Sequence, residues 1–186
     1  MNDNEFTTFV TALKFAAEKH RYERRKDELK SAYITHPIQV VEVLWKTGGV
    51  RDIDLLTAAL LHDVLEDTPT EEAEIGEPFG QQVLNLVKEV TDNKALSKIE
   101  RKQMQVQHAS TLSPKAKMLK LSDKICNVRD IREYPPAAKD WTLNRKMEYI
   151  VWSKEVVDKM RGINQNLETK FNEEYALTYQ DLVTRQ

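Results

Sequence analysis

Apolar residues recur along most of this chain at the three- to four-residue spacing that places them on one face of an α-helix. The first such series covers residues 6–17, and the polar, aperiodic stretch over residues 20–32 that follows predicts a loop. A second helix is predicted from His36 to Gly48, because Pro37 is tolerated in a first helical turn and a glycine commonly ends a helix.

Residues that cap or break helices divide the rest of the chain in the same way. Asp52 is expected to cap one helix and Ser97 another, since their side chains can accept a hydrogen bond from the first turn. The helices predicted after residue 48 cover residues 53–67, about 80–90, 97 onward, 113–134, 142–161 and 163 to the C-terminus. Glycine is scarce, and Lys, Glu, Leu and Ala are abundant. The pattern therefore predicts an all-α fold of about eight or nine helices in a single domain.

The predicted helix over residues 53–67 carries polar residues that do not fit a simple apolar core. It is apolar nearly all round until His62 and Asp63, so we expect it to be central and buried. Burying an adjacent His and Asp costs roughly several kcal/mol unless the two are paired or bind a cation. Glu66 and Asp67 follow at the i,i+4 spacing, so all four groups point toward one end and one side of the helix. Three converging carboxylates repel one another and favour a cation between them.

His36 and Asp123 complete a candidate metal site with His62 and Asp63. His36 begins its helix directly after a loop, and Asp123 interrupts an apolar face. Two imidazoles and two carboxylates form a mixed nitrogen and oxygen ligand set that suits Mn²⁺, with Zn²⁺ and Fe²⁺ as the other candidates. Such a site would leave Glu66 and Asp67 beside the metal, able to orient a water or to move its protons.

Ordinary structural roles are the alternative for each of these residues. An adjacent His and Asp occur by chance in many proteins, and His62 could bond a backbone carbonyl in the core. Asp123 could simply pair with Lys124 or Arg129. Glu66 and Asp67 could form a solvated helix end, although carboxylates there oppose the helix dipole. We interpret His20 and His108 as surface residues and Cys126 as a core residue, because no partner spacing accompanies them.

The segment over residues 20–30 is a candidate anion-binding loop. It contains Arg21, Arg24, Arg25, Lys26 and Lys30 against three acidic residues. A solvated charged loop is the simpler interpretation, but its place just before His36 favours a second one. Basic residues beside a metal would hold a phosphate-rich ligand, since arginine grips phosphate and stacks on bases.

Overall charge and hydropathy exclude other classes of function. The 28 basic and 30 acidic residues give a net charge of −2, so the chain as a whole does not attract nucleic acid or an acidic membrane. Its apolar runs are too short to span a bilayer, and the N-terminus does not resemble a secretory signal. The sequence lacks GxGxxG and Walker motifs. A cytoplasmic protein that binds neither nucleic acid nor a membrane is the resulting expectation, and a nucleotide, if bound, would not be held by a glycine-rich loop.

The ordered set His36, His62-Asp63 and Asp123 resembles the H…HD…D signature of the HD-domain metal-dependent phosphohydrolases. Three segments resemble the hydrolase domain of RelA/SpoT proteins: AYITHPIQVVEVL, AALLHDVLEDT and AKMLKLSDKICNVRDI. Within that family the chain is most similar to the stand-alone small alarmone hydrolases, the branch of the metazoan SpoT homologue. The resemblance covers about residues 6–175.

This resemblance implies an HD-domain helical bundle and a reaction. The motif core is expected over about residues 6–135, with helices over about 142–186 completing the pocket of a single domain, 1–186. The expected reaction is Mn²⁺-dependent removal of the 3′-diphosphate from guanosine tetra- or pentaphosphate, which gives GDP or GTP and diphosphate. The positions that match the family are His36, His62, Asp63 and Asp123 as metal ligands, Glu66 and Asp67 as the water-activating pair, and Arg25, Lys26, Asn127, Lys98, Arg145 and Tyr149 as substrate contacts.

The resemblance leaves other activities open. Related enzymes imply an NADPH 2′-phosphatase or another nucleotide phosphohydrolase as alternatives, and a non-catalytic alarmone sensor is a third hypothesis. The chain also departs from the family at Lys30-Ser31-Ala32-Tyr33, where relatives often have Gly-x-Pro-Tyr, so the rim of the pocket is expected to differ. Bifunctional relatives carry a synthetase region after this domain, for which 186 residues leave no room. We therefore expect hydrolysis without synthesis.

Overall fold

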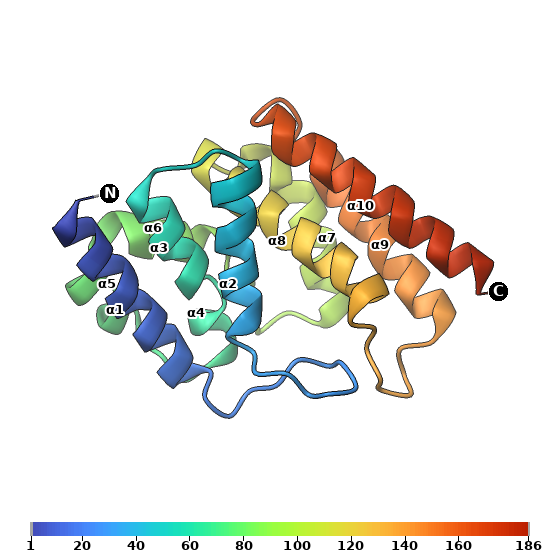
Figure 1. The fold of residues 1–186 in the computed structure, drawn as a ribbon, viewed down its shortest axis with the longest axis horizontal. Coiled ribbons are helices and arrows are strands. Elements are labelled where there is room, and N and C mark those ends of the chain that lie inside the picture. The colour runs from blue at the N-terminus through green and yellow to red at the C-terminus, as the bar shows by residue number, and fades with distance from the viewer. Residues whose placement is uncertain (1, 186) are drawn as a thin grey trace.

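A computed structural model describes residues 2–185, and these residues form an all-α fold (Figure 1). The elements are α1 (Asp3–Lys19), α2 (Thr35–Glu42), the π-helical segment η1 (Val43–Thr47), α3 (Ile53–Leu61), α4 (Val64–Asp67), α5 (Glu72–Phe79), α6 (Gln81–Val90), α7 (Lys98–His108), the 3₁₀ turn η2 (Ala109–Thr111), α8 (Pro114–Glu133), α9 (Leu143–Asp158) and α10 (Gln165–Thr184). Among the described residues β-structure is limited to isolated bridges, so the predicted fold class is confirmed.

The expected capping residues begin the helices that they were predicted to begin. The Asp52 carboxylate accepts a hydrogen bond from the backbone of Leu55 at the start of α3. Ser97 and Glu100 form a reciprocal capping box at the start of α7. Because these side chains satisfy backbone N–H groups that lack helical partners, local sequence alone fixes where the helices start.

The prediction of a single helix over residues 53–67 is wrong, because the chain turns at His62 and Asp63, between α3 and α4. The Nδ1 atom of His62 donates to the Ala59 carbonyl at 2.8 Å. An unbroken helix would use that carbonyl to accept from the backbone N–H of Asp63. The polar side chain that marks the candidate site therefore also interrupts the helix.

A helix that the hydrophobic pattern did not predict, α5, follows α4. It contains Gly76 and Pro78, which both disfavour a helical prediction. A capping box between Glu71 and Glu74 begins it, and Gly80 ends it with a φ of 89°, a left-handed conformation that favours glycine. Capping and the burial of Ile75 and Phe79 thus outweigh the low intrinsic helix propensity of this segment.

The arrangement of helices places α3 at the centre and the two long loops at one edge. Helix α3 packs against α1, α2, α6 and α8, and α10 lies along α8 and α9 (Figure 1). The loop between α1 and α2 meets the segment between α8 and α9, since Asp27 pairs with Pro136 and the Ala137 backbone donates to the Lys26 carbonyl at 2.9 Å. Across residues 2–185, no helix combines the length and the apolar character that crossing a membrane requires.

Candidate metal centre and substrate pocket

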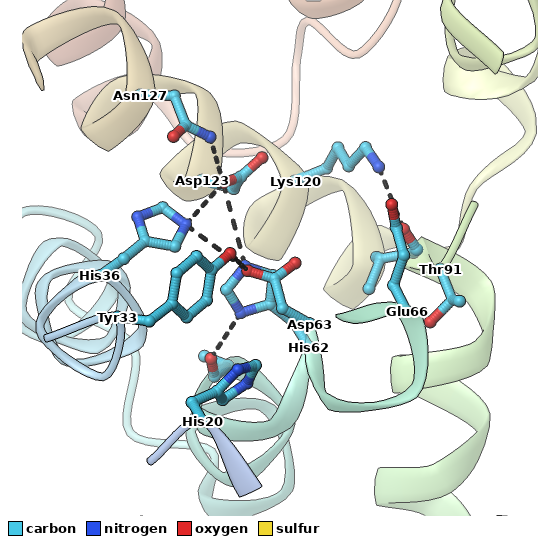
Figure 2. A network of polar contacts seen from close by, with 12 residues as sticks. His20, Tyr33, His36, His62, Asp63, Glu66, Thr91, Lys120, Asp123 and Asn127 are labelled. Atoms are coloured by element: carbon cyan, nitrogen blue, oxygen red, sulfur yellow. Dashed lines mark hydrogen bonds and ion pairs between the residues drawn. The ribbon is translucent and has the colours of Figure 1, made fainter. Parts of the chain in front are cut away.

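The four predicted metal ligands meet at the junction of three helices. Figure 2 shows His36 from α2, His62 and Asp63 from the turn after α3, and Asp123 from α8 pointing toward one another. His36 Nε2 lies 3.1 Å from Asp123 Oδ1, and His62 Nε2 lies 3.0 Å from Asp63 Oδ2. Ligand atoms of His36, His62 and Asp123 all lie within 4.8 Å of one another. Residues separated by up to 87 positions therefore form one compact donor set.

The hydrogen bonding of His62 fits a divalent cation at this point. Because Nδ1 donates to the Ala59 carbonyl, a neutral ring presents the lone pair of Nε2 to the Asp63 and Asp123 carboxylates. This buried nitrogen has no hydrogen-bond partner. Metal-bound histidines are typically oriented in this way, with the second ring nitrogen held by a carbonyl. A cation between Nε2 and the carboxylates would satisfy all three groups.

The pKa shifts of the clustered side chains also indicate that this site favours positive charge. Burial tends to lower the pKa of His62, but the adjacent Asp63 carboxylate outweighs burial and raises it to about 9. Burial raises the pKa of Asp123, yet the Lys124 ammonium and the His36 hydrogen bond more than offset this and hold it well below its usual range. Both shifts favour ionised carboxylates, which attract positive charge to this cluster.

Tyr33 is a residue of the candidate site that the sequence analysis did not single out. Its hydroxyl donates to Asp63 Oδ2 at 2.5 Å, and burial, followed by the Asp63 charge, raises the pKa of the phenol well above its usual value (Figure 2). The phenol thus remains a donor. On the other side of the cluster, Asn127 Nδ2 donates to Asp123 Oδ1 at 2.5 Å and Lys124 donates to Oδ2 at 3.2 Å. Both carboxylates are held in fixed orientations, as metal ligands usually are.

Glu66 and Asp67 face different spaces. Glu66 lines a cavity of about 200 Å³ that also contains the four candidate ligands, and its Oε2 accepts the Asp92 backbone N–H at 3.1 Å. Burial raises its pKa. Asp67 instead lines a larger pocket and pairs with the Lys94 ammonium at 2.6 Å. Of the predicted acidic pair, Glu66 is thus the member that shares the metal cavity.

The larger pocket, of about 530 Å³, is lined by the basic loop and by aromatic side chains. Arg25 and Lys26 lie on its wall, and Arg25 is held at 2.6 Å by the nearly buried carboxylate of Asp130. Tyr33, Asn127 and Tyr149 line both this pocket and the metal cavity, so they join the two spaces. A volume of this size is typical of a small-molecule site.

Lys98 and Arg145, also expected as substrate contacts, line neither space. Burial lowers the pKa of Lys98, and the charges of Arg145 and Lys26 lower it further. Arg145 forms an ion pair with Asp140, and its guanidinium lies 4.7 Å from the centroid of the Trp141 ring. These cations form a positive rim beside the pocket, close enough to influence one another.

His20 is buried, so its predicted surface role is wrong. Its Nδ1 lies 2.6 Å from Glu23 Oε2, and its ring packs on Tyr33 with 4.7 Å between centroids. The hydrophobic pattern could not show this, because the partner ring lies across the loop. His108 is exposed and Cys126 is buried, as predicted. Burial raises the pKa of the Cys126 thiol, which argues against a nucleophilic role.

Comparison with known proteins agrees with this geometry. The HD domain pattern matches residues 12–154. The chain belongs to the HD domain family. This HD domain protein is 48% identical over 163 residues to the guanosine-3′,5′-bis(diphosphate) 3′-pyrophosphohydrolase MESH1 of Xenopus tropicalis, covering 88% of this chain and 90% of that one. Identity to human MESH1 is 46% over 165 residues, covering 89% and 91%.

The fold is also similar to that of a solved structure. The protein in it is a metazoan ortholog of SpoT, described as hydrolysing ppGpp and as playing a role in starvation responses. It matches with a TM-score of 0.88 at 44% identity, covering 91% of this chain and 94% of that chain. The predicted resemblance is confirmed, and the HD fold together with the His36, His62 and Asp123 cluster indicates a divalent metal.

Proposed function

We propose that this HD domain protein is a Mn²⁺-dependent guanosine-3′,5′-bis(diphosphate) 3′-diphosphatase, which converts (p)ppGpp to GDP or GTP and diphosphate. The observation that carries the proposal is a buried cluster of two imidazoles and two carboxylates that opens, through Asn127 and Tyr149, into a basic and aromatic pocket. The similarity to MESH1 enzymes over nine-tenths of their length supports the same activity.

His36, His62, Asp63 and Asp123 would hold the metal. A bound divalent ion would polarise a phosphoryl oxygen and lower the pKa of a coordinated water. The mixed ligand set with two carboxylates favours Mn²⁺, and Zn²⁺ and Fe²⁺ are the alternatives to be tested. Tyr33 and Asn127 hold the two carboxylates in place by hydrogen bonds to one oxygen of each.

Glu66 is proposed to orient the attacking water and to accept its proton, because it lines the metal cavity without being one of the four candidate ligands. Asp92 also lines this cavity, but its carboxylate is engaged by Gln105 at 2.6 Å. The raised pKa of Glu66, caused by burial, brings it closer to the value that suits a general base near neutral pH. Asp67, on the side of the larger pocket, would assist from the substrate side.

The substrate contacts proposed are Arg25, Lys26, Asn127, Lys98, Arg145 and Tyr149. Guanidinium and ammonium groups would offset the charge of two diphosphates, and the aromatic wall offers surfaces on which a base can stack. Trp141 adds to this wall, since Lys26 and Arg145 both lie over its ring. A positive rim and an aromatic wall together fit a small nucleotide that carries several phosphates.

The test is an incubation of metal-free protein with Mn²⁺, Zn²⁺ or Fe²⁺ and either guanosine tetraphosphate or NADPH. We expect release of diphosphate from guanosine tetraphosphate, highest with Mn²⁺ and absent with chelator. Release of phosphate from NADPH alone would assign the 2′-phosphatase activity instead. Tight binding of the alarmone without product, by folded and metal-loaded protein, would indicate a sensor.

A further inference from the structure

A buried lysine in the metal cavity has no role in the proposed reaction. Lys120 extends from α8, and only 12% of its side chain is exposed. Burial lowers its pKa, and the nearby Lys124 charge lowers it further. Removing an ammonium group from water is costly unless polar partners compensate. The partners of Lys120 therefore indicate what the residue does.

Those partners belong to the segment that follows α6. Lys120 Nζ donates to the carbonyl of Val90, the last residue of α6, at 3.0 Å, and lies 4.0 Å from Asp92 Oδ1. The Val90 carbonyl is one of the acceptors that a helix C-terminus leaves without an internal partner. Figure 2 shows the lysine extending toward the segment that holds Thr91, next to Glu66.

The same segment holds the proposed general base. The backbone N–H of Asp92 donates to Glu66 Oε2 at 3.1 Å, and the Asp92 carboxylate accepts from Gln105 Nε2 of α7 at 2.6 Å. Lys120 and Gln105 thus fix Asp92 from two helices. Asp92 in turn fixes one oxygen of Glu66 in the cavity.

We propose that Lys120 is a positioning residue for Glu66: it pins the end of α6 and Asp92 so that the Asp92 N–H holds the carboxylate toward the metal cavity. The proposal rests on the proposed function, in which Glu66 orients the attacking water. Displacing a catalytic group by about 1 Å can cost roughly 100-fold in rate. A fixed backbone donor is therefore a means by which a distant lysine controls turnover.

The bonding of Lys120 favours a role through the protein over direct contact with substrate, because its ammonium donates to the Val90 carbonyl at 3.0 Å. Lys120, Asp92, Gln105 and Val90 line both the metal cavity and a second cavity of about 230 Å³. These four residues form the wall between the two spaces. None of the four lines the larger pocket. Loss of the ammonium should accordingly act on turnover and not on substrate affinity.

The first experiment is a double-mutant cycle between Lys120→Met and Glu66→Gln, with kcat, KM and bound metal measured for each protein. We expect Lys120→Met to lower kcat roughly 10- to 100-fold, with KM within about twofold and metal content unchanged. Because the lysine acts through Glu66, Lys120→Met should cause no further loss in the Glu66→Gln background. Lys120→Arg should recover part of kcat. Lys117→Met, one turn earlier on α8 and outside both cavities, is the matched control.

Three results would overturn the proposal. A raised KM at unchanged kcat would make Lys120 a substrate contact, and equal losses in both backgrounds would remove the link to Glu66. The third is hydrogen exchange at the Asp92 amide of metal-free Lys120→Met that is as slow as in the wild type. The proposal predicts faster exchange there, whether or not the protein is active. If Lys120→Met does not fold, Gln105→Leu takes its place in the cycle. Wild-type protein that releases no diphosphate would contradict the proposed function, whereas active wild-type protein with additive losses contradicts only the role of Lys120.

Discussion

The metal centre and the substrate pocket are built differently, although they share a wall. The candidate ligands are anchored in or beside α2, α3 and α8, and His36 and His62 are almost fully buried. The pocket is formed largely by the loop between α1 and α2 and by the segment between α8 and α9, where Lys26 and Trp141 are at least partly exposed. Rigid helices fix the atoms that need exact distances, whereas loops present the charges and rings that recognise a ligand.

The largest effect should follow removal of a metal ligand. Either His62→Ala or Asp63→Ala is expected to abolish both bound metal and turnover, because the remaining donors cannot complete the site. Metal content by elemental analysis and diphosphate release measure the two losses together. Full activity in either variant would mean that the ligand assignment is wrong.

Asp67→Asn should separate chemistry from metal binding. Asp67 lies outside the donor set and pairs with Lys94, so the variant should keep its metal while kcat falls roughly 100-fold or more. Asn retains the shape of Asp but lacks the negative charge with which Asp67 would assist from the substrate side. Kinetics at saturating substrate with parallel metal analysis provide the check, and loss of the metal would move Asp67 into the ligand set.

Tyr33→Phe tests whether the loop serves the metal centre as well as the pocket. The change removes the hydrogen bond to Asp63 Oδ2 and leaves the packing against His20 intact. Partners of metal ligands typically account for roughly 10- to 100-fold in metal affinity or activity. Titration of metal-free protein with Mn²⁺ should show this weakening. An unchanged affinity for Mn²⁺ would mean that Tyr33 serves the substrate pocket and not the metal centre.

Arg25→Ala should act on the pocket and spare the metal. A hydrogen bond to a charged group contributes about 1.5–3 kcal/mol, so we expect KM to rise roughly 10- to 100-fold with metal content unchanged. The variant also leaves Asp130 without its ion-pair partner, which lowers stability. Thermal unfolding is therefore measured beside the kinetics, with Arg51→Ala, which does not line the pocket, as the control.

The sequence predicts the residues of the metal centre better than the contacts that the loop between α1 and α2 makes. The four candidate ligands and Glu66, which the structure brings to one cavity, could be singled out from the sequence because of their order along the chain and because His62, Asp63 and Asp123 interrupt apolar patterns. The role of Tyr33 and the burial of His20 could not, because each depends on a contact between segments that are distant in the chain. The turn at His62 was missed because hydrophobic spacing continues through it, and only the side-chain bond to Ala59 reveals the break.

The smallest effect is expected in the loop itself, at Lys30, where the family resemblance led us to expect a glycine. Lys30 has a φ of 50°, a left-handed conformation that costs a residue with a side chain roughly 1–2 kcal/mol. Lys30→Gly relieves this strain but adds freedom to the unfolded chain, so the net gain should be about 0.5–1 kcal/mol. Thermal unfolding should then shift upward by roughly 1–4 °C for a chain of this size. Glu28→Gly, at an exposed position of the same loop whose φ is not positive, should give no such gain. Equal shifts in both variants would mean that the loop gains from flexibility in general and that Lys30 is not strained.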